Sequence, residues 1–258
     1  MNKLTLVIAV LFSVIMMLTN CHDINDNNDT NHELQQKIYQ SSLVNPTFTE
    51  LQSFYEAKYT VINGNIKFTE LDELLNMLTL SNIKTIKGYF IISGIYSLVS
   101  LDGLSNLTSI GGELIIYDNH SLTNINALSN LKSINGGLTI YDNHSLTNIN
   151  ALSNLKSING DLIISTNKNL TNIDALSKLT TIGGNLRINY NKNLTNIDGL
   201  SNLSSINNTI YIHNNPLLSD LCGIHNLLSR GFISSSIHIY DNQFNPTVEE
   251  IIAVNCSQ

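Results

Sequence analysis

The sequence has no tryptophan, only three prolines and three cysteines, and few charged residues. Its 13 lysines and arginines are scattered singly, and the formal net charge is −7. Nucleic acids require clustered positive charge to neutralise their phosphates, so this composition excludes them as partners. Hydrophobic residues make up 42% of the chain, which indicates a folded protein with a sizeable core.

Only one long hydrophobic run is present, at the N-terminus. Lys3 precedes an apolar run from Leu4 to Leu18, which is short for a membrane span and typical of a secretory signal peptide. The run ends in LTNC, which resembles the lipobox of bacterial lipoproteins, where the cysteine is lipidated and becomes the mature N-terminus. We expect residues 1–21 to be a lipoprotein signal peptide and Cys21 to carry the lipid. The alternative is an ordinary signal peptide, with Cys21 incidental.

A polar segment follows Cys21. Residues 22–31, HDINDNNDTN, contain one apolar residue and cannot bury enough surface to offset the entropy of ordering the chain. We expect residues 22–44 to form a flexible tether. Acidic residues directly after the cysteine also resemble the export signal of surface-exposed bacterial lipoproteins. This resemblance implies an outer-membrane lipoprotein of the cell envelope, attached to the membrane through its N-terminal lipid and exposed at the surface.

A 24-residue repeat fills most of the remaining chain. The segment IYDNHSLTNINALSNLKSING occurs unchanged at residues 116–136 and again at 140–160. Steps of 24 residues also connect columns of leucine, isoleucine and asparagine, the last being Asn119, Asn143, Asn167, Asn191 and Asn215. One unit cannot bury its own apolar face, so a fixed period of this length predicts a solenoid of stacked units.

Each unit contains a predicted strand. In GELIIYDN, Leu114 and Ile116 alternate with Ile115 and Tyr117, which is the two-residue period of a strand with one buried face. The constant period predicts about eight 24-residue rungs in parallel register. The residues expected inside are Leu107, Ile110, Leu114, Ile116, Leu122 and their equivalents.

Two polar features of the unit have structural explanations. The asparagine column is predicted to be a buried ladder in which each side-chain amide bonds backbone in its own or the next rung, with ligand binding as the alternative. Glycines such as Gly111, Gly112, Gly136 and Gly160 precede the strands, where we expect corners with unusual backbone angles.

The unit resembles a known family. The pattern LxxLxxIxGxLxIxxNxxLxxIxxL, with YTVINGNIKF at residues 59–68, resembles the receptor L domain of the insulin and epidermal growth factor receptor ectodomains and its leucine-rich-repeat-like relatives on bacterial surfaces. The resemblance implies an all-β solenoid, a right-handed parallel β-helix, over residues 59–242. A leucine-rich-repeat horseshoe is the alternative. The resemblance implies fold more than partner, because members of the family bind different things.

Both ends of a solenoid must be covered. Capping-box spacings of Thr47 with Glu50 and of Thr49 with Gln52 predict a capping helix within residues 45–58.

The C-terminal cap is expected at residues 243–258, where Thr247 and Glu250 predict a second short helix. Cys222 and Cys256 flank this cap, so we expect a disulfide between them in an oxidising compartment. Two buried or free thiols are the alternative.

The outward face of the predicted sheet is the candidate binding surface. Exposed aromatic and aliphatic side chains on a flat sheet suit a protein or glycan partner. The candidate ligand-binding residues are Tyr89, Ile91, Ile115, Tyr117, Tyr141 and Ile163. The alternative is that β-propensity alone places tyrosine and isoleucine there.

His120 and His144 repeat on adjacent turns beside Asp118 and Asp142, and could in principle hold a metal ion. Duplication of the unit accounts for the pair without one, so no metal and no cofactor is predicted.

No catalytic constellation can be assembled from the sequence. There is no Ser-His-Asp order, glycine-rich phosphate loop or paired-carboxylate cleft. The sequence therefore predicts a surface-anchored, non-enzymatic binding module with no catalytic residues. A glycan-active β-helix enzyme and a passive surface spacer are the alternatives.

Overall fold

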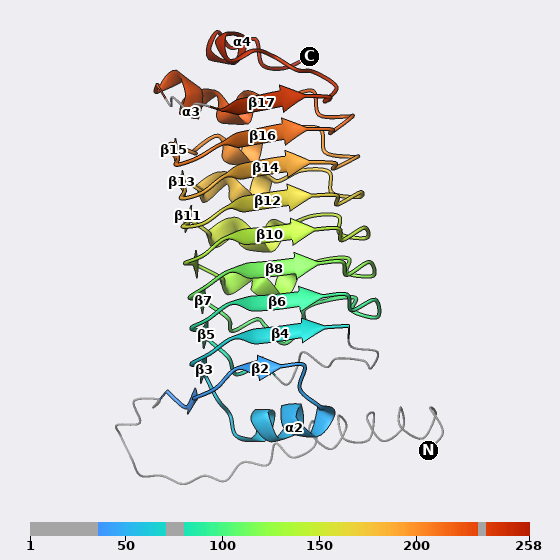
Figure 1. The fold of residues 1–258 in the computed structure, drawn as a ribbon, viewed down its shortest axis with the longest axis vertical. Coiled ribbons are helices and arrows are strands. Elements are labelled where there is room, and N and C mark those ends of the chain that lie inside the picture. Colours follow the sequence, from blue (N-terminus) through green and yellow to red (C-terminus); the bar gives the residue numbers. More distant parts are fainter. Residues whose placement is uncertain (1–35, 71–79, 232–235) are drawn as a thin grey trace, which may run out of the picture. The chain divides into compact units, whose positions relative to one another are not determined.

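The computed structural model describes residues 36–70, 80–231 and 236–258. Residues 36–258 form one compact unit. Figure 1 shows its rungs stacked in chain order between helix α2, Phe48–Glu56, and helix α4, Val248–Ile252. The predicted signal peptide, Cys21 and residues 22–35 of the predicted tether lie outside the described residues.

Each rung contributes strands to two sheets, and every pairing within them is parallel. The larger sheet has nine strands: β2 Leu43–Val44, β4 Ile66–Thr69, β6 Phe90–Ser93, β8 Leu114–Tyr117, β10 Leu138–Tyr141, β12 Leu162–Ser165, β14 Leu186–Asn189, β16 Ile210–His213 and β17 Ile237–Tyr240. The smaller sheet has eight two-residue strands: β1 Ile38–Tyr39, β3 Val61–Ile62, β5 Thr85–Ile86, β7 Ser109–Ile110, β9 Ser133–Ile134, β11 Ser157–Ile158, β13 Thr181–Ile182 and β15 Ser205–Ile206. The predicted parallel β-helix is confirmed.

The 24-residue period sets the register. Leu114 pairs with Leu138, which pairs with Leu162, so identical columns lie directly above one another. The predicted interior is confirmed: Leu107, Ile110, Leu114, Ile116 and Leu122 are all fully buried.

The larger sheet has one rung more than predicted. Strands β1 and β2 lie in the segment predicted to be tether, and they pair with β3 and β4. The predicted tether boundary at residue 44 is therefore wrong for residues 38–44. The period hides this rung, because Leu43 pairs with Ile66 at a step of 23 residues.

The asparagine column forms the predicted ladder. Asn143 Nδ2 donates to the carbonyls of Ile116, at 2.9 Å, and Tyr141, at 3.1 Å. Its Oδ1 accepts the backbone N–H of Asn119, at 3.2 Å. The same pattern continues through Asn215, and all five side chains are fully buried. These amides are thus committed to the scaffold.

The glycines before the strands correct one expectation. Gly111, Gly112, Gly136 and Gly160 do not have positive φ. A Cβ at Gly111 would instead meet the carbonyl oxygen of Lys87 in the preceding rung. Close stacking of backbones, and not an unusual angle, requires glycine there.

Short 3₁₀ helices, which the sequence analysis did not predict, complete several rungs: η2 Asn126–Asn130, η3 Asn150–Asn154, η4 Asp174–Lys178, η5 Asp198–Leu200 and η6 Cys222–Ile224. Each turn of this kind buries an apolar residue, such as Leu128 in η2. With only a few residues each, they carry too short a pattern to be recognised as helical.

Both ends are capped as predicted. The Thr47–Glu50 capping box starts α2, and Leu51 and Phe54 of this helix are buried. At the other end, the Thr247–Glu250 capping box starts α4.

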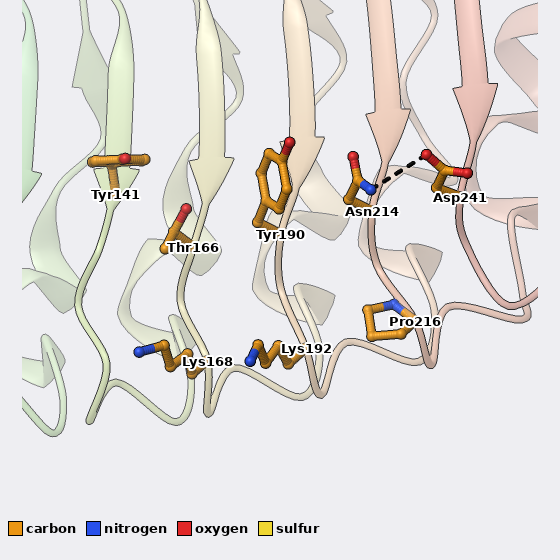
Figure 2. Close-up of a pocket in the computed structure, with 8 residues that line it drawn as sticks. All are labelled: Tyr141, Thr166, Lys168, Tyr190, Lys192, Asn214, Pro216 and Asp241. Atoms are coloured by element: carbon orange, nitrogen blue, oxygen red, sulfur yellow. Dashed lines mark hydrogen bonds between the residues drawn. The ribbon is translucent and has the colours of Figure 1, made fainter.

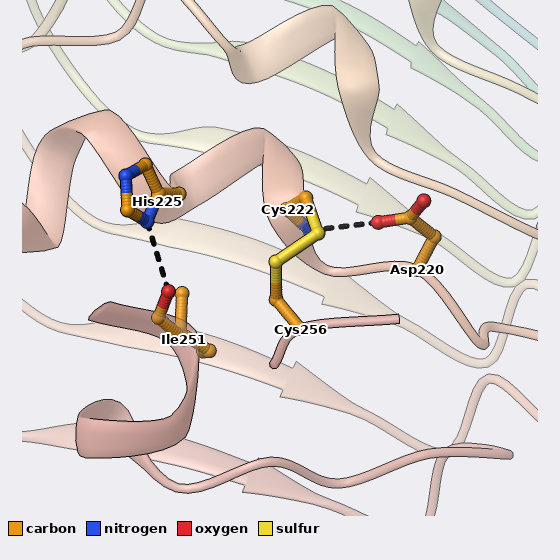
Figure 3. Close-up of a disulfide and its surroundings, with 5 residues drawn as sticks. All are labelled: Asp220, Cys222, His225, Ile251 and Cys256. Atoms are coloured by element: carbon orange, nitrogen blue, oxygen red, sulfur yellow. Dashed lines mark hydrogen bonds between the residues drawn. A yellow bond between two sulfur atoms is a disulfide. The ribbon is translucent and has the colours of Figure 1, made fainter. Parts of the chain in front are cut away.

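The predicted disulfide is present at the C-terminal end. Cys222 and Cys256 are bonded, and Leu221 N–H donates to the Cys256 carbonyl at 2.9 Å (Figure 3). Helix α3, His225–Ser229, packs beside α4, and His225 Nδ1 lies 2.9 Å from the Ile251 carbonyl oxygen. The chain end is therefore fixed to the last rungs. Among the described residues, no helix is both long and apolar enough to cross a membrane.

Candidate binding surface and turn edge

The outer face of the nine-stranded sheet carries most of the predicted site. Ile91 pairs with Ile115, and both Ile115 and Ile163 pair with Thr139, so these side chains form one half-buried outward column. Tyr89 lies two residues before Ile91, at the start of the strand, and therefore occupies a different column.

Tyr117 and Tyr141 form the neighbouring column. They are direct cross-strand partners, 38% and 37% exposed, with ring centroids 5.1 Å apart and planes inclined by 30°. Rings side by side in one plane would overlap at this distance, so the pair is offset-stacked. Partial burial and the nearby Asp118 carboxylate raise the pKa of Tyr117.

The same face changes character toward the C-terminal end. The Arg187 guanidinium lies 5.0 Å from the ring centre of Tyr211, which stacks on His238 at 4.9 Å. His213 stacks on Tyr240 at 4.6 Å. The face is thus aliphatic and tyrosine-rich first, and mixed aromatic and cationic later.

A shallow groove of about 510 Å³ lies beside the strand ends of the later rungs (Figure 2). Its lining residues are Tyr141, Thr166, Lys168, Tyr190, Lys192, Asn214, Pro216 and Asp241. Of these, the sequence analysis predicted Tyr141 alone. The missed signal was periodic: Thr166 and Tyr190 share one column at a step of 24, and Lys168 and Lys192 share another.

The first of these columns has a left-handed backbone. The residue after each four-residue strand has positive φ, between 50° and 59° at Glu70, Asp118, Asp142, Thr166, Tyr190, Asn214 and Asp241. Aspartate and asparagine tolerate this conformation, whereas it is strained for a β-branched or bulky residue. Thr166 and Tyr190 are the strained members, and both line the groove.

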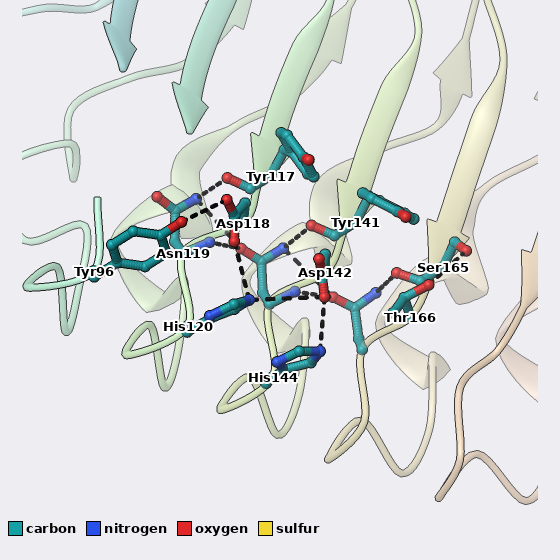
Figure 4. Close-up of polar contacts among 12 residues, drawn as sticks. Tyr96, Tyr117, Asp118, Asn119, His120, Tyr141, Asp142, His144, Ser165 and Thr166 are labelled. Atoms are coloured by element: carbon teal, nitrogen blue, oxygen red, sulfur yellow. Dashed lines mark hydrogen bonds and ion pairs between the residues drawn. The ribbon is translucent and has the colours of Figure 1, made fainter. Parts of the chain in front are cut away.

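The earlier rungs carry acidic and imidazole groups at the same edge (Figure 4). His144 Nε2 lies 2.7 Å from Asp142 Oδ1, and His120 Nε2 lies 3.0 Å from Asp118 Oδ1. The two imidazoles stack with centroids 4.3 Å apart. Burial lowers the pKa of His144, opposed by the Asp142 carboxylate.

The receptor L domain family matches the chain over residues 59–146, 111–167 and 132–231. Together these overlapping matches span more than half of the chain, including strands β3 to β16, the tyrosine pair and the acidic turn edge. No curated protein matches the chain.

Proposed function

Since the chain belongs to the receptor L domain family, a family of ligand-binding modules, we propose that it is a non-enzymatic recognition protein held at the cell surface. Its partner binds along the outer face of the nine-stranded sheet. The observation that carries this proposal is the register-locked row of outward apolar side chains at Ile91, Ile115 and Ile163, flanked by the exposed pair Tyr117 and Tyr141.

A rigid face favours binding because little ordering entropy is lost on association. The rungs are joined by continuous parallel pairing and by the buried asparagine ladder, so the outward side chains are held in fixed positions. Tyrosine supplies large contact area and a hydroxyl, and it is frequent among residues that dominate binding energy.

The ring geometry favours a protein over a glycan. Since Tyr117 and Tyr141 are stacked on each other, their faces are largely turned toward one another. Edges and hydroxyls are left for a partner, which suits protein side chains better than a sugar ring that would stack on an aromatic face.

The groove extends this surface. Tyr141 belongs to both the tyrosine pair and the groove lining, so the two are continuous. Backbone strain at Thr166 and Tyr190 supports a binding role, because strained residues concentrate at functional sites. Lys168 and Lys192 add positive charge, which suits an acidic segment of the partner.

The proposed attachment is a lipid on Cys21. Stable membrane association requires two or more lipid signals, such as the acyl chains of a lipidated N-terminal cysteine. Cys21→Ala is expected to move the protein from the membrane fraction to the soluble fraction. The attachment is contradicted if Cys21→Ala protein remains in the membrane fraction at the wild-type level.

The binding surface is tested with the double variant Tyr117→Ala/Tyr141→Ala. Wild-type chain is first screened against surface-protein extracts and a glycan array, and its affinity for a captured partner is measured. The double variant is expected to lose a few kcal/mol of binding free energy, roughly 2 to 4, with unchanged thermal unfolding.

Val99→Ala is the matched control, because Val99 is exposed and lies outside the strands of the face. Equal affinity of wild type and double variant would place the site elsewhere. Capture of a polysaccharide that the chain then cleaves would favour the enzyme alternative instead.

A further inference from the structure

The two identical repeats bring three metal-binding atoms together at the turn edge. His120 Nε2, a carboxylate oxygen of Asp142 and a ring nitrogen of His144 all lie within 4.8 Å of one another. Asp142 is central, since its Oδ1 lies 2.7 Å from His144 Nε2 and 3.8 Å from His120 Nε2 (Figure 4). The repeat explains this arrangement, because stacking places the carboxylate of one rung next to the imidazole of the rung before.

These spacings suit a tetrahedral ion. Zinc binds histidine nitrogen and carboxylate oxygen at roughly 2.0 to 2.2 Å, which places neighbouring ligand atoms roughly 3.3 to 3.6 Å apart. The observed distances lie on both sides of this spacing. The side chains of His120 and His144 are 40% and 26% exposed, so small rotations can adjust them.

One ligand atom lacks a hydrogen-bond partner. His120 Nε2 is shielded from solvent and makes no hydrogen bond with any described residue. It faces the carboxylates of Asp118, at 3.0 Å, and Asp142, at 3.8 Å. Two positively charged imidazoles stacked at 4.3 Å would repel each other. A single divalent cation would accept both ring lone pairs and balance the two carboxylates.

The surrounding structure holds these groups in place. Asn119 and Asn143, each directly between an aspartate and a histidine in sequence, are fully buried in the ladder. The Tyr96 hydroxyl donates to Asp118 Oδ2 at 3.0 Å and so orients the carboxylate beside His120. Partners of this kind fix ligand geometry around bound metals.

We propose that His120, Asp142 and His144 bind one divalent transition-metal ion of the zinc type, with Asp118 as the neighbouring carboxylate. Two imidazole nitrogens select such ions over calcium or magnesium, which prefer an all-oxygen set. Three protein ligands leave a fourth position open. The ion joins two adjacent rungs.

The test is equilibrium dialysis of the full chain, purified in detergent without a histidine tag, against buffered Zn²⁺, with Ca²⁺ as comparison. Wild type is expected to bind one more Zn²⁺ ion than His120→Ala/His144→Ala. That variant should lose more than about 100-fold in affinity at this site, since loss of an outer partner alone costs 10- to 100-fold. Zn²⁺ should raise the thermal midpoint of wild type, and a chelator should reverse it.

Two further variants make the result decisive. Asp142→Asn preserves shape and should also lose the ion. His213→Ala/His238→Ala removes two imidazoles that lie one rung apart, in strands β16 and β17, and should keep it. Equal Zn²⁺ binding by wild type and Asp142→Asn, or stronger binding of Ca²⁺ than of Zn²⁺, would overturn the proposal.

Discussion

The same turn edge carries different chemistry in two regions of one stack. In the rungs of β8 and β10, the two outward turn columns hold Asp118 with His120 and Asp142 with His144. In the rungs of β12 and β14 they hold Thr166 with Lys168 and Tyr190 with Lys192. We name these the acidic edge and the basic edge. The backbone is nearly the same in both, with φ of 56° and 57° against 59° and 58°.

The scaffold beneath the two edges is also alike. Asn143 donates to the carbonyls of Ile116 and Tyr141 at 2.9 and 3.1 Å, and the equivalent bonds of Asn191 are 2.9 and 3.2 Å. The comparison shows a division of labour within each unit. Interior columns maintain the stack, so the turn columns are free to carry metal ligands in one region and a groove in the other.

The largest expected effect tests whether the scaffolds are equivalent. Asn143→Ala and Asn191→Ala should each destabilise the fold by roughly 2 to 6 kcal/mol, because two or more buried backbone groups lose a partner at about 1 to 3 kcal/mol each. Chemical denaturation measures the free energy of unfolding. Asn130→Ala is the control, since Asn130 donates to the Ser105 carbonyl at the exposed surface. Losses that differ by more than about 1 kcal/mol between the two ladder variants would break the comparison.

A second test concerns the apolar columns. Ile116→Ala and Ile188→Ala remove fully buried side chains, one beneath each edge, and should each cost about 2 to 5 kcal/mol. Ile163→Ala, on the outward face, should cost clearly less because Ile163 is half-buried. A similar loss for Ile163→Ala in the same unfolding measurement would mean that the assigned inner and outer faces are wrong.

Much of this molecule could be predicted from its sequence because the interior repeats. Each buried column recurs at 24 residues, so one strand such as Leu114–Tyr117 predicts its neighbours. Where the step changes, as between Leu43 and Ile66, prediction failed.

The candidate sites were less accessible to sequence analysis because they depend on contacts between rungs. His120 and His144 were visible as a repeated pair, but the approach of Asp142 to both imidazoles follows from stacking. Likewise, Thr166 looks unremarkable in sequence, and its positive φ is a property of the turn.

The smallest expected effect tests that difference in the turn backbone. Thr166→Asn should stabilise the fold by about 0.5 to 1 kcal/mol, because asparagine adopts the left-handed conformation at lower cost than a β-branched residue. Asp241→Asn, at φ 53°, exchanges two residues that both tolerate this conformation and should leave stability unchanged within about 0.5 kcal/mol. Thermal unfolding of both variants measures the difference. If Thr166→Asn gains stability but weakens binding of the captured partner, the strain at the basic edge serves the groove, as strained residues at functional sites do. Loss of stability in Thr166→Asn would instead show that Thr166 is the better residue at this position, and the contrast in strain between the two edges would disappear.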